Sequence, residues 1–199
     1  EVEDAYLLKD GYSQAKWVAE QLMESAAALG LPVTIYRPGN IGPHRITTYA
    51  NRHDLSYLIW QAVAQLKTAP AKTEWRFECT PIDVTAELII KIAHLPRPKK
   101  YYHLVHPRPL TADPLFEKWS GQRMISWQAD WKAWKSVLLS SSNPAHKVLA
   151  TSLPYFNELL IDDPQYSITN LRADVPMAVE YFNQSPDLNS FFDALFNEI

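Results

Sequence analysis

The chain has 199 residues, of which 47% are hydrophobic and 21% charged, and its net charge is −3. These proportions are those of a globular protein with one hydrophobic core or slightly more, and no basic stripe suits nucleic-acid binding. Its five glycines are not spaced as a phosphate-binding loop requires, so neither a glycine-rich dinucleotide loop nor a Walker loop lies within this chain.

The first elements along the chain alternate between helix and strand. Asp10 is expected to cap a helix over residues 11–29, whose apolar residues repeat with helical spacing, and Gly30 suits a left-handed exit. A β-branched run over residues 32–37 follows at once and predicts a buried strand, which Pro38-Gly39 ends. A helix followed directly by such a strand is typical of a parallel sheet, so we expect an α/β fold.

The same alternation continues to about residue 110. The expected elements are a polar loop over 40–53, a helix over 54–66, a half-exposed strand through Trp75, Phe77 and Cys79, a helix over 84–95 capped by Asp83, and a buried strand over 101–105.

Beyond residue 110 the pattern indicates helices only. They are expected over 111–119 with Gly121 at the end, over 127–139, from 144 onwards, over 174–182 and over 186–197, with a joint at 140–142. Trp127, Trp131 and Trp134 form one stripe, which we expect to lie in the core rather than to bind a ligand. The chain is therefore divided into an α/β part, residues 1–110, and a mostly helical part, residues 111–199.

Tyr12 and Lys16 are the strongest candidates for chemistry. Residues four apart share one face of a helix. An ammonium near a phenol favours the phenolate, and a tyrosine tuned in this way can pass a proton to a carbonyl oxygen as hydride arrives at the carbon. Among ten tyrosines one such spacing arises often by chance. Its place near the start of a long helix, followed directly by a strand, gives it more weight.

These surroundings resemble the extended short-chain dehydrogenase/reductase superfamily. More narrowly, they are similar to the thioester reductase domains that end nonribosomal peptide and polyketide assembly lines, with relatives among carboxylic acid, aminoadipate and fatty acyl reductases. The resemblance rests on the segments 11–20, 30–39 and 80–84, on Tyr102-His-Leu104 and on His106-Pro107. It covers about residues 11–110, and a weaker similarity continues through the C-terminal helices.

The resemblance implies a site and a reaction. Tyr12 would be the proton donor, and Lys16 would be its electrostatic partner and contact the cofactor ribose. Backbone around Pro38, Gly39 and Asn40 would line the nicotinamide of NADPH. The reaction would release an acyl or peptidyl thioester from the phosphopantetheine arm of a carrier protein, as an aldehyde or an alcohol.

Two parts of the family pattern lie outside this sequence. Family members begin with a strand, a glycine-rich turn and a helix that bind the NADPH pyrophosphate, and they place a Ser or Thr on a strand before the tyrosine. We therefore expect the C-terminal portion of a Rossmann-like fold that lacks the N-terminal nucleotide-binding strands and continues into a mostly helical substrate-binding subdomain. Alone it is expected to be inactive. An uncovered sheet edge predicts a partner half, an oligomer or rearranged packing.

Two alternatives remain open on the sequence. A nucleotide-sugar epimerase or dehydratase also uses Tyr-x-x-x-Lys and Arg-Pro, although residues 16–20 and the helical C-terminus disfavour it. The other alternative is a docking module that binds a carrier protein or a substrate but has no catalytic activity. A metal site is not expected, because His103 and His106, three apart on a strand, point to opposite faces.

Targeting signals are sparse in this sequence. Its apolar stretches are too short and too interrupted to cross a bilayer, and the acidic N-terminus lacks the basic start of a signal peptide. The single cysteine excludes an intrachain disulfide and fits a reducing compartment. We expect a cytoplasmic protein that binds neither nucleic acid nor membrane.

Overall fold

The computed structural model describes residues 5–8, 10–77, 80–106, 110–123, 125–161 and 167–183. The first half of the chain forms a 3₁₀ turn (Ala5–Leu7), α1 (Gly11–Ala28), β1 (Ile35–Pro38), β2 (Ile41–Gly42), α2 (Leu55–Leu66), β3 (Thr68–Pro70), β4 (Arg76–Phe77), β5 (Thr80–Pro81), α3 (Ile82–Ala93) and β6 (Tyr101–Leu104). The second half forms β7 (Leu110–Thr111), α4 (Ala112–Arg123), β8 (Ser126–Gln128), α5 (Trp131–Ser140), α6 (Pro144–Ile161), α7 (Thr169–Asp174) and α8 (Ala178–Asn183).

The described strands associate in pairs, three of them parallel. β1 pairs with β6, β2 with β5 and β3 with β8 in parallel, whereas β4 and β7 are antiparallel. Parallel strands with intervening helices confirm the α/β class that the sequence predicted. The expectation that strands stop at residue 110 is wrong, because β7 and β8 lie beyond that point and each pairs with a strand from the first half.

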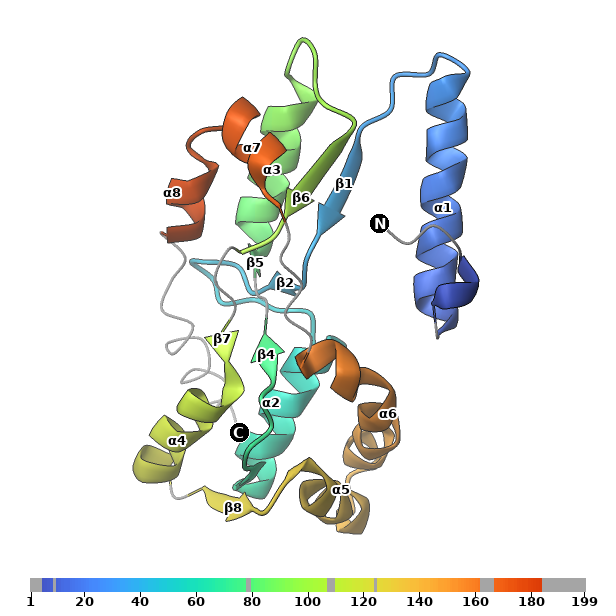
Figure 1. Ribbon diagram of the computed structural model, residues 1–199. Coiled ribbons are helices and arrows are strands. Elements are labelled where there is room, and N and C mark those ends of the chain that lie inside the picture. Colours follow the sequence, from blue (N-terminus) through green and yellow to red (C-terminus); the bar gives the residue numbers. More distant parts are fainter. Residues whose placement is uncertain are drawn as a thin grey trace.

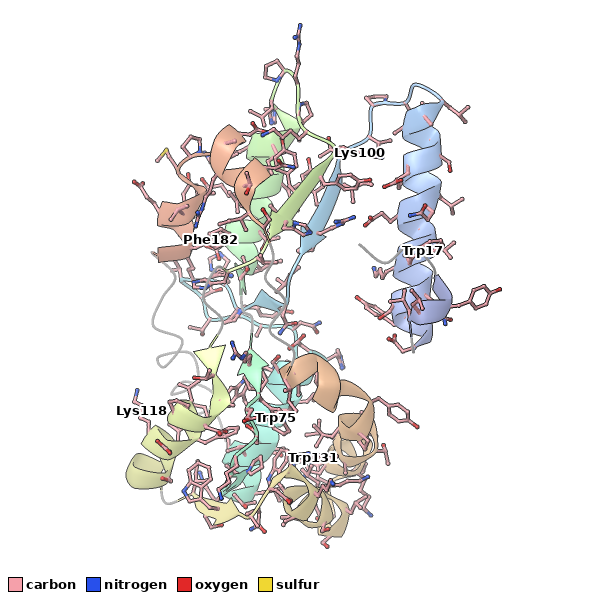
Figure 2. All side chains as sticks on the ribbon, in the orientation of Figure 1. Trp17, Trp75, Lys100, Lys118, Trp131 and Phe182 are labelled. Carbon is pink, nitrogen blue, oxygen red and sulfur yellow. The ribbon has the colours of Figure 1, made fainter. Side chains whose placement is uncertain are left out.

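Two separate hydrophobic clusters hold the fold together (Figure 1). The larger cluster lies among α2, β3, β4, α4, α5 and α6, in the lower part of the view, and includes Trp75 (Figure 2). The smaller cluster lies among α3, β6, α7 and α8 and includes Phe182. Each cluster combines residues from before and after residue 110, so this position does not separate them.

Aspartate caps fix the starts of several helices. Asp10 Oδ1 accepts a hydrogen bond from the Ser13 N–H at 2.8 Å, which confirms the predicted start of α1. Gly30 has a φ of 92°, and this left-handed conformation suits glycine. The predicted cap at Asp83 is wrong: α3 begins at Ile82, and the Asp83 carboxylate accepts from the backbone and side chain of Arg45 instead, at 3.0 and 2.6 Å.

Several boundaries in the second half differ from the sequence prediction. Gly121 lies inside α4 rather than at its end. The helix predicted over 127–139 begins only at Trp131, because Trp127 belongs to β8 and pairs with Ala69. Of the tryptophans expected in the core, Trp134 is fully buried and Trp131 packs against the larger cluster, but the expectation is wrong for Trp127, which is 38% exposed. Cys79 and the helix predicted over 186–197 lie outside the described residues. Among the helices that the structure describes, none is long and apolar enough to span a membrane.

Helix α7 is attached to β6 by a buried tyrosine. The Tyr102 hydroxyl donates to Asp174 Oδ2 at 2.5 Å and accepts from the Lys99 N–H at 2.8 Å. Lys99 Nζ lies 3.3 Å from the other carboxylate oxygen of Asp174. Burial and the hydrogen bond to Asp174 raise the pKa of Tyr102 to about 12. The phenol therefore stays protonated and keeps donating at any ordinary pH.

The joint between α5 and α6 is built around a buried histidine. His146 Nδ1 lies 2.8 Å from Ser141 Oγ, and its Nε2 lies 2.8 Å from Gln65 Oε1 on α2. Since an amide oxygen only accepts, Nε2 carries the proton and Nδ1 accepts from the serine hydroxyl. The neutral form of His146 therefore makes a hydrogen bond with each of its ring nitrogens at this joint.

This histidine makes the stability of the fold sensitive to mild acid. Burial lowers the pKa of His146, so the unfolded chain binds a proton more readily than the folded one. The free energy of unfolding should therefore fall as the pH falls below about 6.5. We expect the urea midpoint to drop further between about pH 7.5 and about pH 5.5 in the wild type than in His146→Gln. His53→Gln, which replaces an exposed histidine, is the control; equal drops in wild type and His146→Gln would contradict the prediction.

Candidate active site

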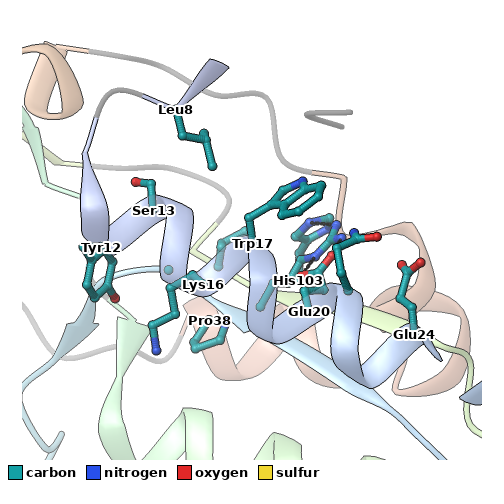
Figure 3. A pocket seen from close by; sticks show the side chains of 13 residues that line it. Leu8, Tyr12, Ser13, Lys16, Trp17, Glu20, Glu24, Pro38 and His103 are labelled. Atoms are coloured by element: carbon teal, nitrogen blue, oxygen red, sulfur yellow. Dashed lines mark hydrogen bonds and ion pairs between the residues drawn. The ribbon is translucent and has the colours of Figure 1, made fainter. Parts of the chain in front are cut away.

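A pocket of about 690 Å³ lies between α1 and the strand pair β1–β6 (Figure 3). Helix α1 supplies most of its wall, and the ends of the two strands supply the rest. The lining residues are Leu8, Tyr12, Ser13, Lys16, Trp17, Glu20, Gln21, Glu24, Arg37, Pro38, Gly39, His103 and Val105.

Tyr12 and Lys16 lie side by side at one end of this pocket (Figure 3). The Lys16 Nζ is 5.5 Å from the centroid of the Tyr12 ring, within the range of a cation–π contact. The side chain of Tyr12 is 74% exposed. The phenol and the ammonium lie on one face of the helix, as the four-residue spacing predicted, and both line the pocket.

The turn after β1 contributes to the same pocket. Pro38 and Gly39 line it together with Tyr12 and Lys16, and the Gly39 N–H donates to the Leu104 carbonyl of β6 at 3.3 Å. Four of the five predicted site residues thus converge. Asn40 is not among the lining residues; its amide donates to Ser56 Oγ at 2.8 Å and its carbonyl accepts from the Thr80 N–H.

The other end of the pocket holds a polar network that the sequence did not predict. The Glu20 carboxylate accepts from Arg37 Nε at 3.0 Å and also from a terminal nitrogen of the same guanidinium. Arg37 NH1 lies 3.4 Å from His103 Nε2. Glu20 follows Lys16 at the same four-residue interval that separates Tyr12 from Lys16. This repeat in the sequence indicates that Glu20 shares the helix face of the other two residues. Its partners depend on the pairing of β1 with β6.

The two histidines near β6 have different surroundings. His103 lines the pocket, and its Nδ1 lies 3.1 Å from the Ser167 carbonyl. His106 Nε2 lies 3.2 Å from the Phe182 carbonyl, away from the pocket. The described ranges contain no group of three or more His, Cys, Asp or Glu side chains placed to hold a metal ion.

Comparison with known proteins relates this chain to reductases. The family described as Male sterility protein matches residues 1–89. The glycine betaine reductase ATRR of Emericella nidulans is 36% identical over 140 residues, which is 70% of this chain and 11% of that protein. The isonitrile lipopeptide synthase of Streptomyces coeruleorubidus is 30% identical over 189 residues, 87% of this chain and 12% of that protein.

A solved structure extends the likeness to the fold. The terminal R domain from the myxalamid PKS-NRPS biosynthetic pathway superposes with a TM-score of 0.71 at 25% identity, covering all of this chain and 51% of the R domain. The chain therefore spans about a tenth of the curated relatives' length and about half of this solved domain. Together with Tyr12, Lys16 and the strand that follows them, the match to the Male sterility family and the likeness to a terminal R domain support the assignment of this chain to a thioester reductase domain.

Proposed function

We propose that this chain is the substrate-side part of an NADPH-dependent thioester reductase. The complete domain would release a carrier-bound acyl or peptidyl chain as an aldehyde or, after a second reduction, as an alcohol. One observation carries the proposal: the Tyr12 hydroxyl and the Lys16 ammonium open into one pocket with the Pro38-Gly39 turn.

The residues of the pocket suit this reaction. Reduced nicotinamide, when bound, supplies the hydride. Tyr12 is the group that would donate a proton to the oxygen of the reduced carbonyl, which is reachable because the phenol is exposed. The C–S bond of the resulting thiohemiacetal would then break, and the hydroxyl proton would pass to the sulfur, so that an aldehyde and the phosphopantetheine thiol are left. Lys16 stabilises the phenolate that remains, and its other N–H groups are donors for a ribose hydroxyl.

The donor groups of this chain fit one end of the cofactor. The ammonium of Lys16 and the backbone of Pro38-Gly39 suit a ribose and a nicotinamide, whereas the five glycines provide no loop for the pyrophosphate. We therefore assign the pyrophosphate to a nucleotide-binding half of the domain, which would cover α1 and the edge of β1 opposite β6, where no other described strand pairs. This edge and the exposed apolar side chains Val18, Leu22 and Met23 suit such a partner.

The remaining parts would meet the substrate. Residues 111–199 would shape the channel for the acyl chain and contact the carrier protein, whose phosphopantetheine arm brings the thioester to Tyr12. The proposal divides these roles at residue 110, a division of function only, since both hydrophobic clusters contain residues from either side of it.

Reconstitution tests the proposal. The chain alone, the nucleotide-binding half alone and their mixture are each titrated with NADPH and then given an acyl-phosphopantetheine thioester. We expect tight NADPH binding only where the nucleotide-binding half is present, and aldehyde, detected by mass spectrometry, only in the mixture. Tight binding of NADPH to the chain alone, or no aldehyde from a mixture that binds NADPH, would overturn it.

A further inference from the structure

Four side chains of α1 form a single stripe along the pocket. Tyr12, Lys16, Glu20 and Glu24 follow one another at intervals of four residues, so they lie on one side of the helix. All four line the pocket, with Tyr12 and Lys16 toward one end and Glu20 and Glu24 toward the other (Figure 3). One half of the stripe carries the proposed chemistry, and the other half faces charged groups of the sheet.

Apolar packing does little to place α1. None of its residues is buried, and the helix stands beside β1 rather than within either hydrophobic cluster (Figure 1). Polar contacts join it to the strand pair: Glu20 binds Arg37 of β1, and Glu24 accepts from the Tyr101 hydroxyl of β6 and lies 3.5 Å from Lys100 Nζ. The position of the helix against the sheet thus depends strongly on these two carboxylates.

Contacts on several sides hold the Arg37 guanidinium in one orientation. Two of its nitrogens donate to the two oxygens of Glu20, a fork arrangement that sets angle as well as distance. Its guanidinium lies over the Tyr101 ring, with Cζ 4.6 Å from the centroid. The Ser167 carbonyl accepts from His103 Nδ1, so the other ring nitrogen is the acceptor that faces Arg37.

We infer that Glu20 and Arg37 form the clamp that sets the position of Tyr12 and Lys16 relative to the Pro38-Gly39 turn. Glu20 lies one helical turn after Lys16, and Arg37 directly precedes Pro38. The pair therefore joins the two walls of the site within one helical turn of Lys16 and one residue of Pro38. Both are positioning residues, and this role rests on the proposed reductase function.

The clamp is expected to matter for geometry more than for global stability. The side chains of Arg37 and Glu20 are 26% and 25% exposed, and ion pairs of this kind contribute little to the free energy of unfolding. Catalysis is more sensitive, because misplacement of a reacting group by about 1 Å can lower the rate roughly 100-fold.

The test combines hydrogen exchange with kinetics. In Glu20→Gln, the chain alone should show faster deuterium exchange in α1, with unchanged exchange in α2 and α3. In the complete domain the same variant should lower kcat roughly 10- to 100-fold with little change in the KM for the thioester. Glu87→Gln makes the same change in an ion-paired glutamate on α3 and is the matched control.

A second variant shows whether the two residues act through each other. Arg37→Gln alone and the double variant with Glu20→Gln should have nearly the same kcat as Glu20→Gln, because the clamp is lost in each. Additive losses would overturn the inference, as would wild-type exchange in α1 of Glu20→Gln. If the wild-type complete domain binds NADPH but reduces no thioester, the proposed function fails, and the exchange data alone then decide on the clamp.

Discussion

Replacement of Tyr12 by phenylalanine is expected to lower kcat of the complete reductase domain roughly 100- to 10,000-fold, the usual contribution of a positioned proton donor. The substitution removes one hydroxyl from an exposed side chain and keeps the ring beside Lys16. The fold and the affinity for NADPH should therefore change little. Single-turnover formation of aldehyde, followed by mass spectrometry, measures the loss directly.

The matched control removes a phenol hydroxyl far from the pocket. Tyr155 on α6 is 80% exposed and is not among the residues that line the site. Tyr155→Phe should therefore turn over like the wild type. If Tyr12→Phe also did so, with NADPH binding intact, Tyr12 would not be the proton donor and the assigned chemistry would be wrong.

Replacement of Trp60 by alanine is expected to lower the free energy of unfolding by about 3–5 kcal/mol, the range found for large aromatic residues in close-packed cores. Trp60 is 1% exposed and lies at the centre of an aromatic group. Its ring centroid is 4.8 Å from Phe77, 5.0 Å from Phe116 and 5.1 Å from Trp119. Because Trp60 lies on α2 and these partners lie on β4 and α4, the cavity would loosen three elements at once.

Urea unfolding of the chain measures this effect. Tyr155→Ala, which truncates an exposed aromatic residue on a helix, should change the free energy of unfolding by less than about 0.5 kcal/mol. A loss below about 1.5 kcal/mol for Trp60→Ala would mean that the neighbouring rings close the space, and that the aromatic group is not tightly packed.

Local signals in the sequence predicted much of the first half of the fold. The cap at Asp10 and the left-handed Gly30 act within a few residues, so both ends of α1 were readable. The cap at Asp83 failed because a distant residue, Arg45, binds that carboxylate. The helix predicted at Trp127 was wrong for a related reason. The spacing of Trp127 from Trp131 fits a helix, but β8 pairs with β3, nearly 60 residues earlier along the chain, and this pairing makes Trp127 part of a strand.

The candidate site divides in the same way. The spacing of Tyr12 and Lys16 places them on one face of a helix, whereas Pro38 and Gly39 were expected at the site only through the family resemblance. The network of Arg37 and His103 could not be predicted, since it exists only when β1 and β6 pair in register. A site residue whose partners come from distant elements leaves no periodic trace in the sequence.

The two hydrophobic clusters have a consequence for how the protein emerges from the ribosome. The segments that form the two clusters alternate along the chain. In the larger cluster residues 57–77 pack against residues 112–160, and in the smaller cluster residues 84–105 pack against residues 168–182. During synthesis the apolar face of α3 and β6 therefore stays exposed until Leu171 and Phe182 have been translated. The larger cluster can close once residue 160 has been translated, whereas the smaller cluster stays incomplete until residues 168–182 follow.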